Sequence, residues 1–75
     1  MELLSISNYV KGMRKRYSMT QLELSQKAGV GLRFVRELEQ GKPSLRMDKV
    51  NMILDLFGGE MVVRQLNLAE EGRDE

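Results

Sequence analysis

Apolar residues recur every three or four positions along the first part of this chain, and this spacing is typical of amphipathic helices. The first stretch predicts a helix over residues 7–16, with Ser5 or Ser7 as its N-cap and Gly12 as a weak point inside it. Its last turns are rich in lysine and arginine, which suit the negative end of a helix dipole. The face that this helix would bury holds Ile6, Tyr9, Val10 and Met13.

Two short helices joined by a tight turn are predicted next. Thr20 and Glu23 have the spacing of a capping box, so the second helix begins after Thr20 and runs to about residue 27. Gly29 can take the left-handed conformation that ends a helix sharply, and a third helix is expected over residues 31–39. A glycine and a proline at 41–43 stop it. The apolar residues available for burial on the third helix are Phe34, Val35 and Leu38.

A fourth helix is expected over residues 45–57, with Ser44 as its N-cap and the glycine pair at 58–59 as its end. Met52 and Leu56 lie partly off its apolar stripe, so this helix has more apolar surface than one core needs. The stripe itself is formed by Met47, Val50, Ile53, Leu54 and Phe57.

Residues 60–68 are rich in branched apolar side chains and predict one β-strand, with a short helix as the weaker alternative. A lone strand leaves its backbone donors and acceptors unpaired, and no other part of the sequence has a strand pattern. Pairing with the same strand of a second copy about a two-fold axis solves this problem, so we predict a homodimer. Residues 69–75 are expected to form a disordered tail. The expected dimer interface comprises Met52, Leu56, Met61, Val62, Val63 and Leu66.

A length of 75 residues allows one domain, which we expect over residues 1–68. The sequence has no cysteine, which excludes disulfides and thiolate metal sites, and no histidine, the commonest general base at neutral pH. We therefore expect neither an enzyme nor a bound metal or cofactor, and such a small core favours support from a second copy. No stretch is long enough to span a membrane and the first five residues do not resemble a signal peptide, so a cytoplasmic protein is expected.

The net charge of +1 hides an uneven distribution of charged residues. Residues 3–49 hold ten lysines and arginines against four acidic residues, whereas residues 50–75 hold two against six. A basic first part suits a polyanion such as DNA, and the acidic end is expected to point away from phosphates. Blocks of charge are also typical of solvated faces, so charge alone leaves both interpretations open.

Two short helices joined by a glycine-containing turn are typical of the helix-turn-helix, here at residues 20–39. The chain resembles the Cro/C1-type (XRE) family of bacterial and phage regulators, and the likeness covers residues 6–57. This resemblance implies a mainly α, lambda-repressor-like domain of four to five helices. It is carried by residues 19–24 (MTQLEL), Gly29-Val30, Val35 and residues 38–42 (LEQGK).

Residues 30–43 and 45–50 also look like the HipB-like antitoxins. In that group a strand ends the domain and pairs across the dimer, and the repressor is produced together with a HipA-like kinase toxin, which it binds. The resemblance implies autorepression of a toxin–antitoxin operon. A free-standing regulator with no toxin partner is the alternative.

The third helix is expected to lie in the major groove of double-stranded DNA. Arg33 and Arg36 would project from its exposed face, where each can make a bidentate contact with guanine. Leu32 offers only apolar contact, for instance with a thymine methyl group. The alternative for the two arginines is a solvated position or pairing with Glu37 and Glu39.

Three further positions are expected near the DNA backbone. Gln21 matches the family position that holds a phosphate, and Lys42 in the loop after the third helix is a second candidate for phosphate contact. Gly31 stands where the family usually has a serine that caps the recognition helix, so a side-chain contact is lost there. Glu39 is expected to brace the motif, and Arg14 to be solvated.

These features together predict a sequence-specific repressor that reads a palindromic operator as a homodimer. We expect it in the bacterial cytoplasm, associated with the nucleoid through its operator. Leu22 lies where the second helix is usually polar, so it either packs against the first helix or is exposed for a partner.

Overall fold

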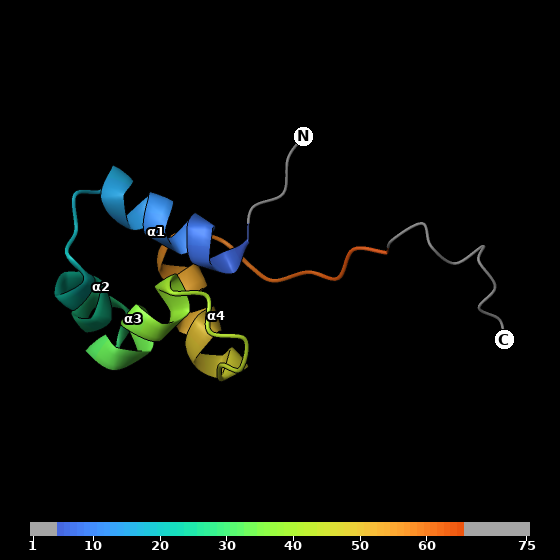
Figure 1. Cartoon of the computed structure of the whole chain (residues 1–75). Coiled ribbons are helices and arrows are strands. Elements are labelled where there is room, and N and C mark those ends of the chain that lie inside the picture. The colour runs from blue at the N-terminus through green and yellow to red at the C-terminus, as the bar shows by residue number, and fades with distance from the viewer. Residues whose placement is uncertain (1–4, 66–75) are drawn as a thin grey trace, which may run out of the picture.

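The computed structural model describes residues 5–65, and within that range the chain forms four helices (Figure 1). In order, α1 spans Ile6–Arg16, α2 spans Gln21–Ala28, α3 spans Leu32–Glu39 and α4 spans Met47–Leu56. The mainly helical fold is confirmed, and a fifth helix is not found among the described residues. None of the four helices has the length and apolar character that crossing a bilayer requires.

The first two helices begin at hydrogen-bonded caps. Ser5 is the N-cap of α1, because its hydroxyl accepts from the Asn8 backbone N–H at 3.2 Å, which decides between the two candidate serines. At α2, the Glu23 backbone N–H donates to Thr20 Oγ1 at 3.0 Å and the Thr20 backbone N–H donates to Glu23 Oε1 at 2.8 Å. The predicted capping box is therefore confirmed, and it sets the first residue of α2.

The turn between α2 and α3 depends on Gly29. Its φ angle of 79° is left-handed, and its backbone N–H and that of Val30 both donate to the Ser25 carbonyl at 3.0 Å. A side chain at this position would also be crowded, because a Cβ atom there would lie 3.3 Å from Met52 Cε. Gly29 is thus required for the backbone conformation, whereas the end of the flexible Met52 side chain could move aside.

The core draws buried side chains from all four helices. α3 packs against both α1 and α2, and α4 packs against α2, so that one face of α3 is enclosed (Figure 1). The other face of α3 is left to solvent. The buried apolar residues are Val10, Leu24, Val35, Leu38, Val50, Ile53 and Leu54.

The start of α4 differs from the prediction. Ser44 does not cap it; Arg46 occupies the N-cap position without a side-chain hydrogen bond, and the helix begins at Met47. The reason is tertiary: Leu45 packs against the core before the helix starts. Met47 was expected on the buried stripe, but it is 67% exposed, and the buried positions of α4 begin at Val50.

The chain after α4 passes behind α1 in the view of Figure 1 and then leaves the domain. The Phe57 ring stacks on Tyr17 with 6.0 Å between centroids, and Gly59 passes so close to Tyr9 that a Cβ atom there would lie 3.0 Å from Oη. Residues 60–65 form neither the predicted strand nor a helix within this single chain. Residues 66–68 of that strand and the predicted tail at 69–75 lie outside the described residues.

Two glycine substitutions test this description of the helices. Gly12→Ala should stabilise the domain by about 0.5–1 kcal/mol, because alanine favours a helix interior and a Cβ atom there meets nothing within 4 Å. Gly29→Ala should destabilise it by at least about 1 kcal/mol, because the left-handed conformation is unfavourable for alanine. Thermal unfolding measures both effects. A Gly29→Ala variant that unfolds at a higher temperature than the wild type would contradict the described turn.

Candidate nucleic-acid interface

A nearly buried ion pair fixes the end of α3. Arg14 on α1 donates from Nε to Glu39 Oε2 at 2.7 Å and from Nη2 to Oε1 at 2.9 Å. Gln21, the first residue of α2, donates from Nε2 to the same Oε1 at 3.1 Å. The exposed fractions of the two charged side chains are only 14% for Arg14 and 3% for Glu39. The carboxylate therefore joins three helices at one point, and the prediction that Glu39 braces the motif agrees with this geometry.

Arg14 also closes the turn between α1 and α2. Its Nη1 donates to the Met19 carbonyl at 3.0 Å, and its own carbonyl accepts from the Met19 backbone N–H at 3.0 Å. The expectation that Arg14 is solvated was therefore wrong. The sequence does hold a sign of its role, because Arg14 follows the buried Val10 by four residues and so shares its helix face.

The ion pair keeps both groups charged. Burial alone would raise the pKa of the Glu39 carboxyl, but hydrogen bonds from Arg14 and Gln21 and the charges of Arg14 and Lys11 outweigh it, and the pKa lies below its ordinary value. The hydrogen bond to Glu39 raises the pKa of Arg14, against the effect of its own burial. The network is therefore fully ionised at neutral pH.

The exposed face of α3 brings together four of the residues predicted to meet DNA. Gly31 is the N-cap of the helix, makes no side-chain cap, and has open space where a Cβ atom would lie. Leu32 is half-buried at the first turn, whereas Arg36 is exposed and the Arg33 side chain is 91% exposed. The predicted recognition face is thus accessible over its whole length.

Glu37 lies between two of the predicted DNA contacts. Arg33 Nε donates to Glu37 Oε2 at 3.2 Å, and Lys42 Nζ donates to Glu37 Oε1 at 3.3 Å. The hydrogen bond from Lys42, followed by the weaker effect of Arg33, lowers the pKa of the Glu37 carboxyl despite some burial. Pairing with a glutamate was the alternative to a solvated position for the arginines of α3. Arg33 does pair with Glu37, whereas Glu39 binds Arg14.

Gln21 lies at the start of α2, half-buried beside Glu39. A side-chain amide has two N–H donors, so the bond to Glu39 leaves one donor for a phosphate oxygen. The position of Gln21 is compatible with the predicted phosphate contact, which stays a prediction.

The predicted dimer residues lie in two places. Met52 and Leu56 are exposed on α4, whereas Val62 and Val63 are exposed on the segment that leaves the domain, Val63 at 97%. Leu66 lies outside the described residues. Leu22 is exposed on α2, so of its two alternatives the structure favours an exposed position over packing against α1.

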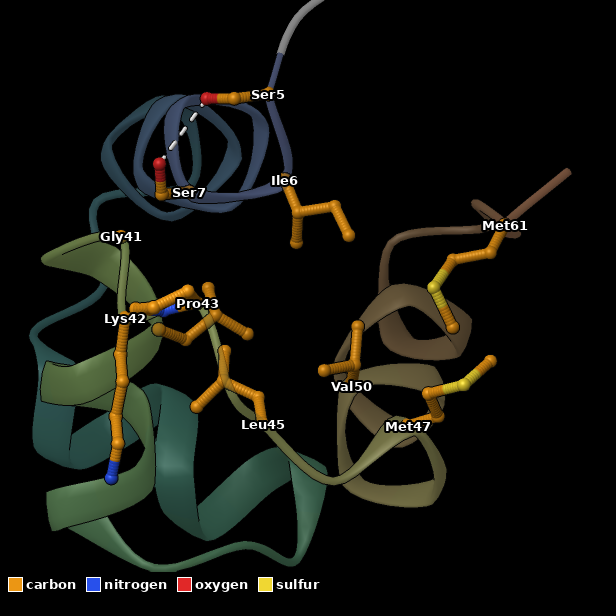
Figure 2. A pocket seen from close by; sticks show the side chains of 11 residues that line it. Ser5, Ile6, Ser7, Gly41, Lys42, Pro43, Leu45, Met47, Val50 and Met61 are labelled. Atoms are coloured by element: carbon orange, nitrogen blue, oxygen red, sulfur yellow. Dashed lines mark hydrogen bonds between the residues drawn. The ribbon is translucent and has the colours of Figure 1, made fainter. Parts of the chain in front are cut away.

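An open apolar groove of about 300 Å³ was not predicted from the sequence. It lies between the start of α1, the loop after α3 and the start of α4, and Met61 stands at its edge (Figure 2). The segment that carries the exposed Val62 and Val63 therefore begins at the edge of this apolar groove. The apolar lining comprises Ile6, Leu38, Pro43, Leu45, Met47, Val50 and Met61.

The stability of the domain should depend on the ionisation of Glu39. Because folding lowers the pKa of this carboxyl from about 4.5, its contribution is complete above that pH and is lost as the pH falls through the folded-state pKa. Glu39→Gln should lower the free energy of unfolding by about 3 kcal/mol at neutral pH, because Arg14 is left without its counter-charge. The variant should also lose less of its remaining stability on acidification than the wild type.

Chemical unfolding between neutral pH and about pH 3 measures this linkage. Asp48→Asn is the matched control, because Asp48 pairs with Arg46 on the exposed surface and such pairs contribute little. Equal effects of the two substitutions at neutral pH would contradict the role given to Glu39.

Known proteins resemble this chain in sequence or in fold. The family model described as Helix-turn-helix matches residues 10–63. An uncharacterised HTH-type transcriptional regulator of Sinorhizobium fredii, y4mF, is 43% identical over 53 residues, which cover 71% of this chain and 70% of that protein. Two solved chains, one described as "MDT Protein" and one from a HipA–HipB–O2–O3 complex, each superpose with a TM-score of 0.69 at 20% identity, covering 87% of this chain and 96% of their own. The chain therefore belongs to the Cro/C1-type (XRE) helix-turn-helix family of DNA-binding transcriptional regulators.

Proposed function

We propose that this protein is a sequence-specific transcriptional repressor that reads the major groove with α3. The observation that carries the proposal is the two-sided character of this helix. Val35 and Leu38 are buried on one side, while Arg33 and Arg36 are exposed on the other. A guanidinium presented from a recognition helix can donate two parallel hydrogen bonds to guanine O6 and N7, which is the commonest specific contact in the major groove.

Neighbouring groups are suited to position α3 on the duplex. Gln21 stands at the N-terminus of α2, where backbone N–H groups also favour a phosphate. Lys42 follows α3 and Gly31 precedes it, so phosphate contacts can form on both sides of the bases that are read. Leu32, half-buried in the first turn, leaves an apolar edge for a thymine methyl group.

The protein is proposed to act as a homodimer on a palindromic operator. The support is the exposure of Val62 and Val63 on a segment whose sequence pattern predicts a strand. Two-fold pairing of residues 60–68 would cover the two exposed valines and would bring them and Met61 of each copy close to the axis. A dimer of this kind fits half-sites about 34 Å apart, one turn of the duplex.

An antitoxin role is the finer form of this proposal. It rests on the likeness of residues 30–43 and 45–50 to the HipB-like antitoxins, and the shared fold with a chain of the HipA–HipB complex is compatible with it. The protein would then repress its own operon and bind a kinase-like toxin, with the exposed Leu22 as a candidate contact. A free-standing regulator is the alternative. Co-purification with the kinase-like product of a neighbouring gene would separate the two.

Arginine substitutions on α3 test the reading of DNA. The probe is the duplex that the wild-type protein enriches from a random-sequence library, compared with a scrambled duplex. Arg33→Ala and Arg36→Ala should each weaken binding to the enriched duplex by about 1–3 kcal/mol and relax preference at one base pair. Lys42→Ala should weaken binding to all sequences alike and reduce the salt dependence by about one charge. If the double variant at Arg33 and Arg36 binds the enriched duplex like the wild type, α3 is not the reading element.

A single substitution tests the dimer. Val63→Asp should yield a monomer in analytical ultracentrifugation, because it would place two negative charges in diagonally neighbouring positions beside the two-fold axis. Val63 is 97% exposed, so the fold of each domain should be unaffected. Leu22→Asp is the matched control, an exposed apolar residue outside the predicted interface, and it should remain dimeric. A Val63→Asp variant that stays dimeric would place the interface elsewhere.

A further inference from the structure

The exposed face of α3 carries a carboxylate in the midst of its cations. Glu37 lies one turn after Arg33, and the loop that follows the helix brings Lys42 back to it. DNA is a polyanion, so an acidic side chain at this place opposes the binding that its neighbours favour. The inference below rests on the proposed function, the reading of DNA by α3. If α3 reads DNA, a carboxylate that weakens binding to every sequence needs a compensating role.

The geometry makes Glu37 the common partner of both cations. One carboxylate oxygen accepts from Arg33 Nε at 3.2 Å and the other from Lys42 Nζ at 3.3 Å. The Lys42 backbone N–H also donates to the Glu37 carbonyl at 3.1 Å, so the loop is tied to this residue twice. The Glu37 side chain is partly buried, whereas the side chains of both cations are exposed.

The two kinds of DNA complex would meet this carboxylate differently. Sequence-independent binding comes from charge neutralisation at the phosphates, and there Glu37 cancels one of the two positive charges beside it. Specific binding uses the shape of the guanidinium. An arginine has five N–H donors, and because Glu37 accepts from Nε of the exposed Arg33 side chain, the N–H groups of the two terminal nitrogens can still donate to guanine.

We infer that Glu37 is a specificity-determining residue of the recognition helix. Its carboxylate suppresses sequence-independent binding and holds Arg33 in an extended orientation for base contact. The residue thus widens the ratio between the affinity for the correct site and the affinity for other DNA, at some loss of total affinity.

Three variants separate this role from a general effect of charge. Glu37→Gln removes the negative charge, whereas Glu37→Asp keeps it but shortens the side chain, so that it no longer spans both cations. Asp55→Asn is the control, because it removes one negative charge from α4, which holds none of the predicted DNA contacts. Dissociation constants are measured on the enriched and scrambled duplexes over a range of salt concentrations, and circular dichroism verifies the helical fold of each variant.

Glu37→Gln should bind the scrambled duplex about five- to tenfold more tightly than the wild type at 0.1 M salt, with a salt slope steeper by about 1. Its preference for the enriched duplex should fall by about fivefold or more. Glu37→Asp should bind the scrambled duplex like the wild type and the enriched duplex more weakly. Asp55→Asn should leave the preference unchanged.

Two outcomes would overturn the inference alone. One is a wild type that enriches a sequence while Glu37→Gln keeps the full preference for it. The other is an equal gain in scrambled-duplex affinity for Glu37→Gln and Asp55→Asn. A wild type that enriches no sequence would instead contradict the proposed function, and the specificity role of Glu37 would fall with it.

Discussion

The ion pair between Arg14 and Glu39 is the interaction on which the rest of this small domain depends. It joins the end of α3 to α1, takes in the start of α2 through Gln21, and closes the turn at Met19 through the same guanidinium. A pair this well buried is costly to desolvate and costly to break, so the helices that contribute to it are held in one relative arrangement. The orientation of α3, and therefore of its exposed arginines, follows from that arrangement.

Two glutamates on α3 have different roles, because they lie on different faces of the helix. Glu39 and Glu37 are two residues apart, so they point to nearly opposite sides of α3. Glu39 faces α1 and binds one buried cation, which fixes the helix in the domain. Glu37 lies on the other side and binds two exposed cations, Arg33 and Lys42. The same residue type thus serves structure on one face of α3 and, as we propose, selectivity on the other.

Local features of the fold could be predicted from the sequence, because their causes lie within a few residues. The capping box at Thr20 and Glu23 and the left-handed Gly29 are of this kind. The role of Arg14 could not be read locally, since its partner is 25 residues away and several other cations surround it. The start of α4 was missed because the packing of Leu45, rather than the serine before it, decides where the helix begins.

The recognition face was predicted as a set of residues on α3, and the structure adds how they are connected. Arg33 and Lys42 were expected as separate contacts, but Glu37 links them. The strand predicted over residues 60–68 depends on pairing with a second copy, so its formation belongs to the proposed dimer and not to the fold of one chain. The proposal that α3 reads bases in the major groove is tested most directly by methylation interference on the enriched duplex. If α3 reads guanine with Arg33 and Arg36, methylation at guanine N7 in the major groove should block binding at guanines in each half-site, one turn apart. Interference confined to adenine N3 in the minor groove would contradict it.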